Sequence, residues 1–128
     1  MNKEKYSIEF VLGNASQQSL WRMLTDSTMM EEWFADKVKI KDGKFYKFVW
    51  EDNFQEVEQT INRPISQVRY NWLAEDRLDT YFEFKIHTME LSNEIALEVI
   101  AFATPDEKDD AIFLWETQIG LLKRKLGI

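Results

Sequence analysis

A single histidine, His87, limits the acid–base and metal chemistry that this sequence could carry. Histidine is the most common general base in enzymes and the most common protein ligand for transition metals. The alternation in the segment TYFEFKIH places His87 on the side opposite Phe84 and Ile86, which is the side expected to face water. We therefore predict a surface histidine. The absence of cysteine excludes disulfides, thiolate chemistry and cysteine-ligated metals.

The densest group of carboxylates comprises Asp106, Glu107, Asp109 and Asp110. A calcium loop needs an internal glycine and a defined spacing of oxygen ligands, and this group has neither. It directly precedes an amphipathic segment, where acidic side chains stabilise the start of a helix. We therefore predict that Asp109 or Asp110 caps the last helix, and we predict no metal site.

Phosphate-binding and nucleic-acid-binding functions are disfavoured by glycine spacing and by charge. None of the four glycines forms a G-x-G or G-x-x-x-x-G-K pattern, which argues against a standard loop for ATP or NAD. The formal net charge of −7 opposes binding to nucleic acids and to anionic membranes. The one basic cluster, Lys123 to Lys125, lies where cations complement the end of a helix. We predict no cofactor and no catalytic residue.

The residue types best suited to binding are aromatic, with 9 Phe, 5 Trp and 4 Tyr. Large rings either fill a core or line an apolar cavity, and composition alone does not separate the two. Tyr and Trp are costlier to bury than Phe unless their OH or NH group finds a partner, which favours a cavity for some of them. The residues predicted to line such a ligand cavity are Tyr46, Phe48, Trp50, Tyr70, Trp72, Phe84, Trp115 and Ile119.

Alternating apolar residues define the strands that would position these rings. Strand period is found in residues 5–12, 37–41, 44–50, 53–61, 68–73, 80–87 and 94–103. Ser16 is placed to cap a short helix over QQSLWRMLT, and Asp26 or Ser27 to cap a second over TMMEEWFA. Asp42-Gly43 favours a tight hairpin turn.

The order of elements predicts an α+β fold in one domain, residues 1–128. Strands that follow one another with short turns favour an antiparallel meander, here of seven strands. A curved sheet of this kind must cover one face, and the only long element available is the C-terminal helix. That helix presents Ile112, Trp115, Ile119, Leu122 and Leu126 at helical spacing, with Ala111 and Leu114 widening the apolar stripe.

Two alternatives concern which side chains face inward. A register slip of one residue would bring Arg69 and Gln59 into the interior as polar groups. In addition, four large apolar residues crowd one short helix, which is too small to bury all of them. The alternative for these four residues is an exposed interaction patch. That patch would comprise Met29, Met30, Trp33 and Phe34.

These elements and motifs resemble the START-like superfamily, the helix-grip fold of the Bet v-type allergens and polyketide cyclases. The similarity is greatest to Aha-type co-chaperone homologues, in which a W…LTD…W stretch spans the two short helices. That stretch corresponds here to Trp21, Leu24, Thr25, Asp26 and Trp33. The resemblance implies a cavity between sheet and long helix that binds lipids, sterols, hormones or polyketides. It implies no particular activity.

The sequence therefore favours a cytoplasmic protein that binds a small hydrophobic molecule, lipid-like or polyketide-like. No segment has the length and apolarity of a signal peptide or a membrane span. The alternative is an interaction module of co-chaperone type, acting as a homodimer or with another protein and without a bound ligand. An enzyme is the weakest of the three hypotheses, because no acid–base pair is predicted inside the cavity.

Overall fold

The computed structural model describes residues 2–128. Its elements in chain order are β1 (Glu4–Val11), α1 (Gln17–Thr25), α2 (Ser27–Met30), β2 (Lys37–Lys41), β3 (Phe45–Val49), β4 (Phe54–Arg63), β5 (Gln67–Trp72), the 3-10 turn η1 (Glu75–Arg77), β6 (Tyr81–Thr88), β7 (Ile95–Ala103) and α3 (Lys108–Leu126). The strands form one antiparallel sheet in the order β1-β7-β6-β5-β4-β3-β2. The predicted α+β architecture is confirmed.

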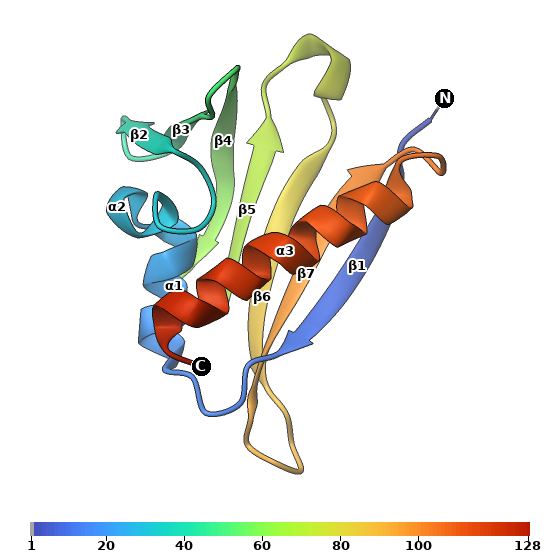
Figure 1. The fold of residues 1–128 in the computed structure, drawn as a ribbon. Coiled ribbons are helices and arrows are strands. Elements are labelled where there is room, and N and C mark those ends of the chain that lie inside the picture. Colours follow the sequence, from blue (N-terminus) through green and yellow to red (C-terminus); the bar gives the residue numbers. More distant parts are fainter. Residues whose placement is uncertain (1) are drawn as a thin grey trace.

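The α3 helix crosses the concave face of the sheet, and α1 and α2 close one end of that face (Figure 1). On α3, Ile119 and Leu122 are fully buried against the sheet. Leu114 is 57% exposed, so the predicted widening of the buried stripe is wrong at this position. Burial of these apolar faces supplies the main stabilisation of the fold.

Local chemistry explains where most elements begin and turn. The Ser16 hydroxyl accepts a hydrogen bond from the Ser19 N–H at 3.2 Å, and the Asp26 carboxylate caps α2 through the N–H groups of Thr28 and Met29. Asp42 and Gly43 adopt φ angles of 54° and 72°, the left-handed conformations that a tight hairpin turn favours, and the Lys44 N–H donates to the Lys41 carbonyl. These sequence predictions are confirmed.

The start of α3 differs from the prediction. The capping position is occupied by Glu107, whose side chain makes no capping hydrogen bond, and the helix begins at Lys108. Asp109 and Asp110 lie inside the first turn. There they interact favourably with the positive end of the helix dipole, but neither residue occupies the N-cap position. The helix therefore begins two to three residues earlier than the acidic pattern indicated.

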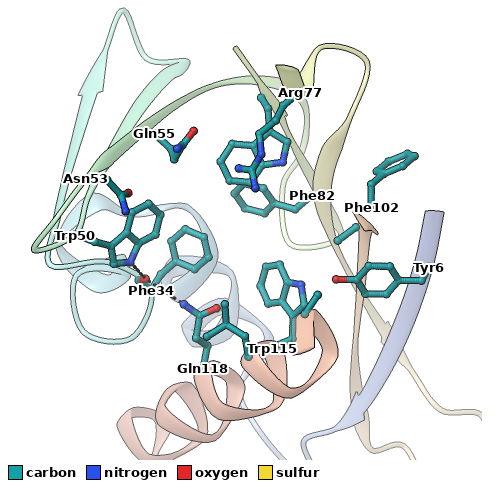
Figure 2. A pocket seen from close by; sticks show the side chains of 14 residues that line it. Tyr6, Phe34, Trp50, Asn53, Gln55, Arg77, Phe82, Phe102, Trp115 and Gln118 are labelled. Atoms are coloured by element: carbon teal, nitrogen blue, oxygen red, sulfur yellow. Dashed lines mark hydrogen bonds between the residues drawn. The ribbon is translucent and has the colours of Figure 1, made fainter. Parts of the chain in front are cut away.

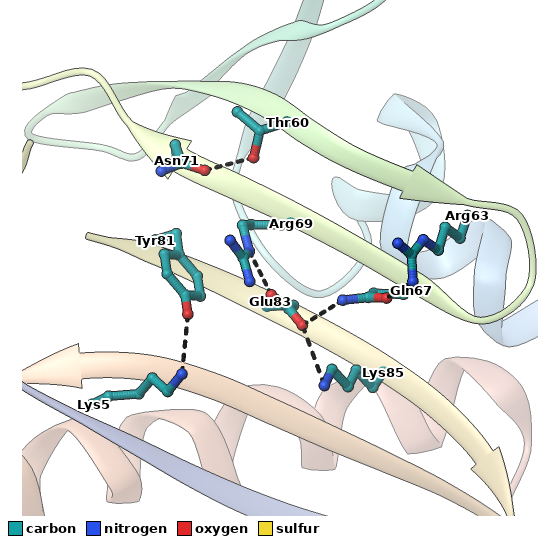
Figure 3. A network of polar contacts seen from close by, with 9 residues as sticks. All are labelled: Lys5, Thr60, Arg63, Gln67, Arg69, Asn71, Tyr81, Glu83 and Lys85. Atoms are coloured by element: carbon teal, nitrogen blue, oxygen red, sulfur yellow. Dashed lines mark hydrogen bonds and ion pairs between the residues drawn. The ribbon is translucent and has the colours of Figure 1, made fainter. Parts of the chain in front are cut away.

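The convex face of the sheet carries a polar network around Glu83 (Figure 3). Although Glu83 points away from the core, its side chain is 1% exposed. Its carboxylate accepts hydrogen bonds from Arg69 and Gln67, and Lys85 lies 3.8 Å away. The Arg69 guanidinium also stacks over the Tyr81 ring, 4.0 Å from its centroid. Each charge that this face buries therefore has a partner.

His87 lies on the same convex face and is exposed, as predicted from the alternation. Its Nε2 is 2.9 Å from a carboxylate oxygen of Glu9 on β1. Both side chains are about half exposed, at 43% and 50%. Such a surface pair contributes little to stability.

Candidate functional site

Three aromatic side chains bind the C-terminal end of α1. The last carbonyl groups of a helix have no partner within it and must be satisfied from outside. Here the Trp33 indole N–H donates to the Met23 carbonyl at 2.7 Å, and the Tyr70 hydroxyl donates to that of Leu24 at 2.6 Å. The Tyr46 hydroxyl donates to the Thr25 carbonyl at 2.7 Å. We call Trp33, Tyr46 and Tyr70 the helix-end cluster.

Gln59 completes the helix-end cluster from β4. Its amide nitrogen lies 3.3 Å from the Tyr46 hydroxyl and 3.5 Å from that of Tyr70. Gln59 alternates with the buried Val57 and so faces inward without any register slip, whereas Arg69 faces outward. Burial raises the pKa of Tyr46, and it raises that of Tyr70 well above the usual value. Both hydroxyls are therefore protonated donors at neutral pH.

Five of the eight predicted ligand residues lie in this packed region. They are Tyr46, Phe48, Tyr70, Phe84 and Ile119, each no more than 4% exposed. The hydroxyl groups of the two tyrosines are satisfied by the end of a helix and need neither water nor a ligand. None of these five residues lines the pocket between the sheet and α3.

A pocket of about 350 Å³ opens beside this region, between the sheet, the N-terminal half of α3 and two loops. Figure 2 shows Trp115 and Gln118 projecting into it from α3, with Trp50 and Phe34 on one side and Tyr6 on the other. The lining residues are Tyr6, Phe34, Trp50, Asn53, Gln55, Trp72, Arg77, Phe82, Ala101, Phe102, Ala111, Leu114, Trp115 and Gln118. Three predicted ligand residues, Trp50, Trp72 and Trp115, are among them.

The polar groups of the pocket differ in how they are satisfied. The Phe34 carbonyl accepts from the Trp50 indole at 3.0 Å and from the Gln118 amide at 3.4 Å, which orients both side chains. The Trp72 indole N–H makes no hydrogen bond with any residue of the range 2–128. The Tyr6 hydroxyl points towards Trp115, and burial raises its pKa. The Trp72 indole therefore retains a donor for a ligand or water.

Arg77 is the only charged side chain among the lining residues, and none of them is acidic. It belongs to η1, and its guanidinium stacks over the Trp72 ring at 4.2 Å from the centroid. The Arg77 carbonyl holds the surrounding turn by accepting from the backbone N–H and the hydroxyl of Thr80. The pocket is therefore positive within a chain whose formal net charge is −7.

The predicted interaction patch is not an exposed surface. Met30, Trp33 and Phe34 are 0%, 4% and 6% exposed, and only Met29 is partly accessible. Their burial follows from the bend after α2, which turns Trp33 towards α1 and Phe34 towards the rings of β3 and β6. The expectation of exposure is therefore wrong for three of the four residues.

Several pocket residues were indicated by periodicity, and others were not. Alternation placed Tyr6 and Phe82 on the inner face, and helical spacing placed Ala111 and Leu114 beside Trp115. Gln118, three residues after Trp115, follows from the same helical spacing. Gln55 follows from alternation as well, because it shares the inner face of β4 with the buried Val57, and Asn53 directly precedes that strand. In contrast, Arg77 lies in η1, outside any periodic segment.

The fold and pocket define an α+β helix-grip protein with a site between the sheet and its C-terminal helix. A domain model of the START-like superfamily matches residues 1–128. The chain belongs to this superfamily, and the resemblance inferred from the sequence is confirmed.

Several solved structures share this fold. BfR322 from Bacteroides fragilis is 35% identical, with a TM-score of 0.68 over 98% of this chain and 92% of that one. The Aha1 dimer from Colwellia psychrerythraea is 19% identical, with a TM-score of 0.78 over 100% and 98% of the two chains. DynU16, a protein of the dynemicin biosynthetic locus, is 16% identical, with a TM-score of 0.75 over 96% of this chain and 47% of that one. No curated protein matches the sequence.

Two further findings concern the described residues. Within residues 2–128, no helix combines the length and the apolarity needed to cross a membrane. In the same range, no group of three or more His, Asp or Glu side chains is arranged to hold a metal ion.

Proposed function

We propose that this protein binds a small hydrophobic ligand, polyketide-like and built around a compact ring system, in the pocket beside Trp115. The observation that carries the proposal is a 350 Å³ pocket lined by Trp50, Trp72, Trp115 and Phe82. Burial of apolar ligand surface against these rings would supply most of the affinity, and the amides and indoles would supply orientation.

The size and shape of the pocket favour a ring system over a long acyl chain. Ligand pockets span roughly 300 to 1,000 Å³, so this one is at the small end of the range. Its walls are broad aromatic faces, which stack well on planar molecules. DynU16, which shares the fold, comes from a biosynthetic locus. That origin is consistent with a polyketide-like ligand here but does not specify one.

Binding without chemistry is the simplest use of this pocket. Its lining residues include no histidine, carboxylate or lysine that could serve as a general base. Tyr6 is the only hydroxyl-bearing side chain among them, and burial raises its pKa away from neutrality. We therefore propose a carrier or sensor of the ligand.

Native mass spectrometry of the freshly purified protein, compared with the denatured mass, tests whether the pocket is occupied. Ala111→Phe should fill the pocket from α3 and abolish any reproducible excess mass. Thr117→Phe adds the same ring on the exposed face of α3 and should leave the excess mass unchanged. Retention of the excess mass in Ala111→Phe would place the ligand elsewhere.

Indole N–H signals in NMR spectra locate a ligand that has been added. The chain has 5 tryptophans, so the five indole signals report on separate places. Naphthalene-2-methanol should shift the signals of Trp72 and Trp115, which line the pocket. The signal of Trp33, which is bonded to the Met23 carbonyl outside the pocket, should not move. Equal shifts in all five would contradict the proposed site.

A second candidate function is association between copies of the chain. The exposed face of α3 carries Phe113, Leu114 and Leu121, which are 69%, 57% and 39% exposed. Apolar residues gathered on one helix face are typical of contact surfaces. One structural neighbour is described as a dimer. Sedimentation equilibrium should show a dimer that Phe113→Ser dissociates, and a monomer at all concentrations would remove this candidate.

A further inference from the structure

Among residues 2–128, two arginines stack on aromatic rings, and they differ in whether a carboxylate pairs with them. Arg69 stacks on Tyr81 on the convex face, and its guanidinium is paired with the Glu83 carboxylate (Figure 3). Arg77 stacks on Trp72 in the pocket at a similar distance, 4.2 Å against 4.0 Å. Within residues 2–128, no carboxylate lies within ion-pair distance of Arg77.

Stacking leaves the edge of a guanidinium available for hydrogen bonds. The face of the group contacts the ring, while its five N–H donors point outward in one plane and match the two oxygens of a carboxylate. In the Arg69 site this edge meets Glu83. In the Arg77 site the edge lies at the wall of the pocket, on the side opposite Trp115 and Gln118 (Figure 2).

No acidic side chain competes for Arg77 within the pocket lining. The chain carries 23 acidic residues, yet none lines the pocket. Glu75 and Asp76 precede Arg77 in the same turn, but both are exposed and lie outside the lining. Partial removal from water strengthens the attraction between Arg77 and an anion in the pocket.

We propose that the ligand is a planar aromatic carboxylate, whose ring stacks among the tryptophans and whose carboxylate pairs with Arg77. This inference rests on the proposed binding function and specifies the chemical class of the ligand. The ligand carboxylate occupies the role at Arg77 that Glu83 has at Arg69. The indole N–H of Trp72 and the amide of Gln55 lie in the same lining and offer further donors to the carboxylate or to ring substituents.

Two probes of nearly equal shape distinguish the contribution of the charge to affinity from the contribution of the ring. Naphthalene-2-carboxylate and naphthalene-2-methanol share the ring system, and only the first is ionised at neutral pH. Affinity is measured by calorimetry, and the site by the indole N–H signals. The carboxylate should bind about 10- to 100-fold more tightly, because hydrogen bonds to charged groups contribute more than neutral ones.

Arg77→Gln should remove this advantage, so that the carboxylate binds no better than the alcohol, while the affinity for the alcohol stays unchanged. Arg77→Lys keeps the charge but loses the planar edge and should retain only part of the advantage. Arg124→Gln removes one exposed cation from α3 and serves as the matched control, with no expected effect. Backbone NMR spectra verify that each variant is folded.

The outcomes distinguish this inference from the proposal on which it rests. If both probes bind equally and Arg77→Gln changes neither affinity, the pocket binds hydrophobic rings and the carboxylate inference is overturned. If Arg77→Gln weakens both probes alike, Arg77 is only part of the wall, and the inference is again overturned. If neither probe shifts the Trp72 and Trp115 signals, the proposed binding function fails and the inference fails with it.

Discussion

The helix-end cluster and the pocket use the same residue types for opposite purposes. In the cluster, the OH and NH groups of Trp33, Tyr46 and Tyr70 all bind the end of α1, so the polar groups fasten one element to another. In the pocket, the indole of Trp72 has no such partner in the described chain, and Arg77 has no counter-ion there. Aromatic residues with polar atoms thus indicate a binding site only where the protein leaves those atoms unpaired.

The largest difference between the two regions should appear when a ring is removed. Phe48 packs beneath the helix-end cluster and is 0% exposed, so Phe48→Ala should lower the free energy of unfolding by about 3–5 kcal/mol. Trp72→Ala removes a larger ring from the half-buried pocket wall and should cost less. Urea unfolding of both variants measures this, and a greater loss for Trp72→Ala would break the comparison.

Removal of a single hydroxyl sharpens the comparison. Tyr70→Phe leaves the Leu24 carbonyl buried without its partner and should lower the free energy of unfolding by about 1–3 kcal/mol. Tyr6→Phe removes a hydroxyl that faces the pocket, where water can replace it, and should change stability by less than about 0.5 kcal/mol. Thermal and urea unfolding of both variants provide the measurement. Equal costs would mean that the two hydroxyls are equally well satisfied.

Alkaline pH should weaken the helix-end cluster selectively. Burial raises the pKa of Tyr46 and Tyr70 above 10.0, so the unfolded chain releases these protons at lower pH than the folded chain. Stability should therefore be unaffected by these two groups below pH 10 and should fall as pH rises above it. Each group contributes at most about 1.4 kcal/mol per pH unit.

The measurement is urea unfolding at a series of pH values from about 9 upwards. It is made on the wild type and on a double variant that carries Tyr46→Phe and Tyr70→Phe. The stability of each protein is expressed relative to its own value at about pH 9. The double variant is less stable throughout, but its stability should fall less steeply above pH 10.0. Parallel curves would show that other groups govern the alkaline loss.

The smallest effect on stability is expected from a conservative change in the pocket wall. Trp72→Phe keeps a ring under Arg77 and removes an N–H that has no partner within residues 2–128. Stability should change by less than about 0.5 kcal/mol. Affinity for naphthalene-2-carboxylate should nevertheless fall several-fold, because tryptophan offers the best surface for a stacked guanidinium. Calorimetry and urea unfolding on one sample test both parts.

Sequence periodicity was sufficient for the strands, for their faces and for the long C-terminal helix, whereas the helix predicted over TMMEEWFA ends at Met30. Tyr46, Tyr70 and Trp72 all lie on the predicted inner face, because alternation is a local property of a strand. The partners of their polar atoms were not predictable in this way. Tyr70 binds a carbonyl 46 positions away in the chain, and only the packing of α1 against the sheet brings the two together.

The pocket was predicted less well than the fold for a related reason. Sequence reasoning treated all inward rings as equivalent, whereas the position of α1 and α2 decides which are covered and which remain accessible (Figure 1). Arg77 lies in the acidic stretch AEDRLD, where no periodicity exists. Its role depends on a turn that folds back over Trp72, and such a contact between a loop and a strand has no local pattern.

The network around Glu83 also has a consequence for how the chain reaches its final alignment. A shift of one residue between β5 and β6 would turn Phe82 and Phe84 outward and Glu83 inward, where its carboxylate would be buried without a partner. The convex face therefore selects against misaligned pairings during folding. Because η1 connects these two strands, the same selection determines where the guanidinium of Arg77 arrives. The residues that fix the alignment of β5 and β6 therefore also fix the geometry of the pocket.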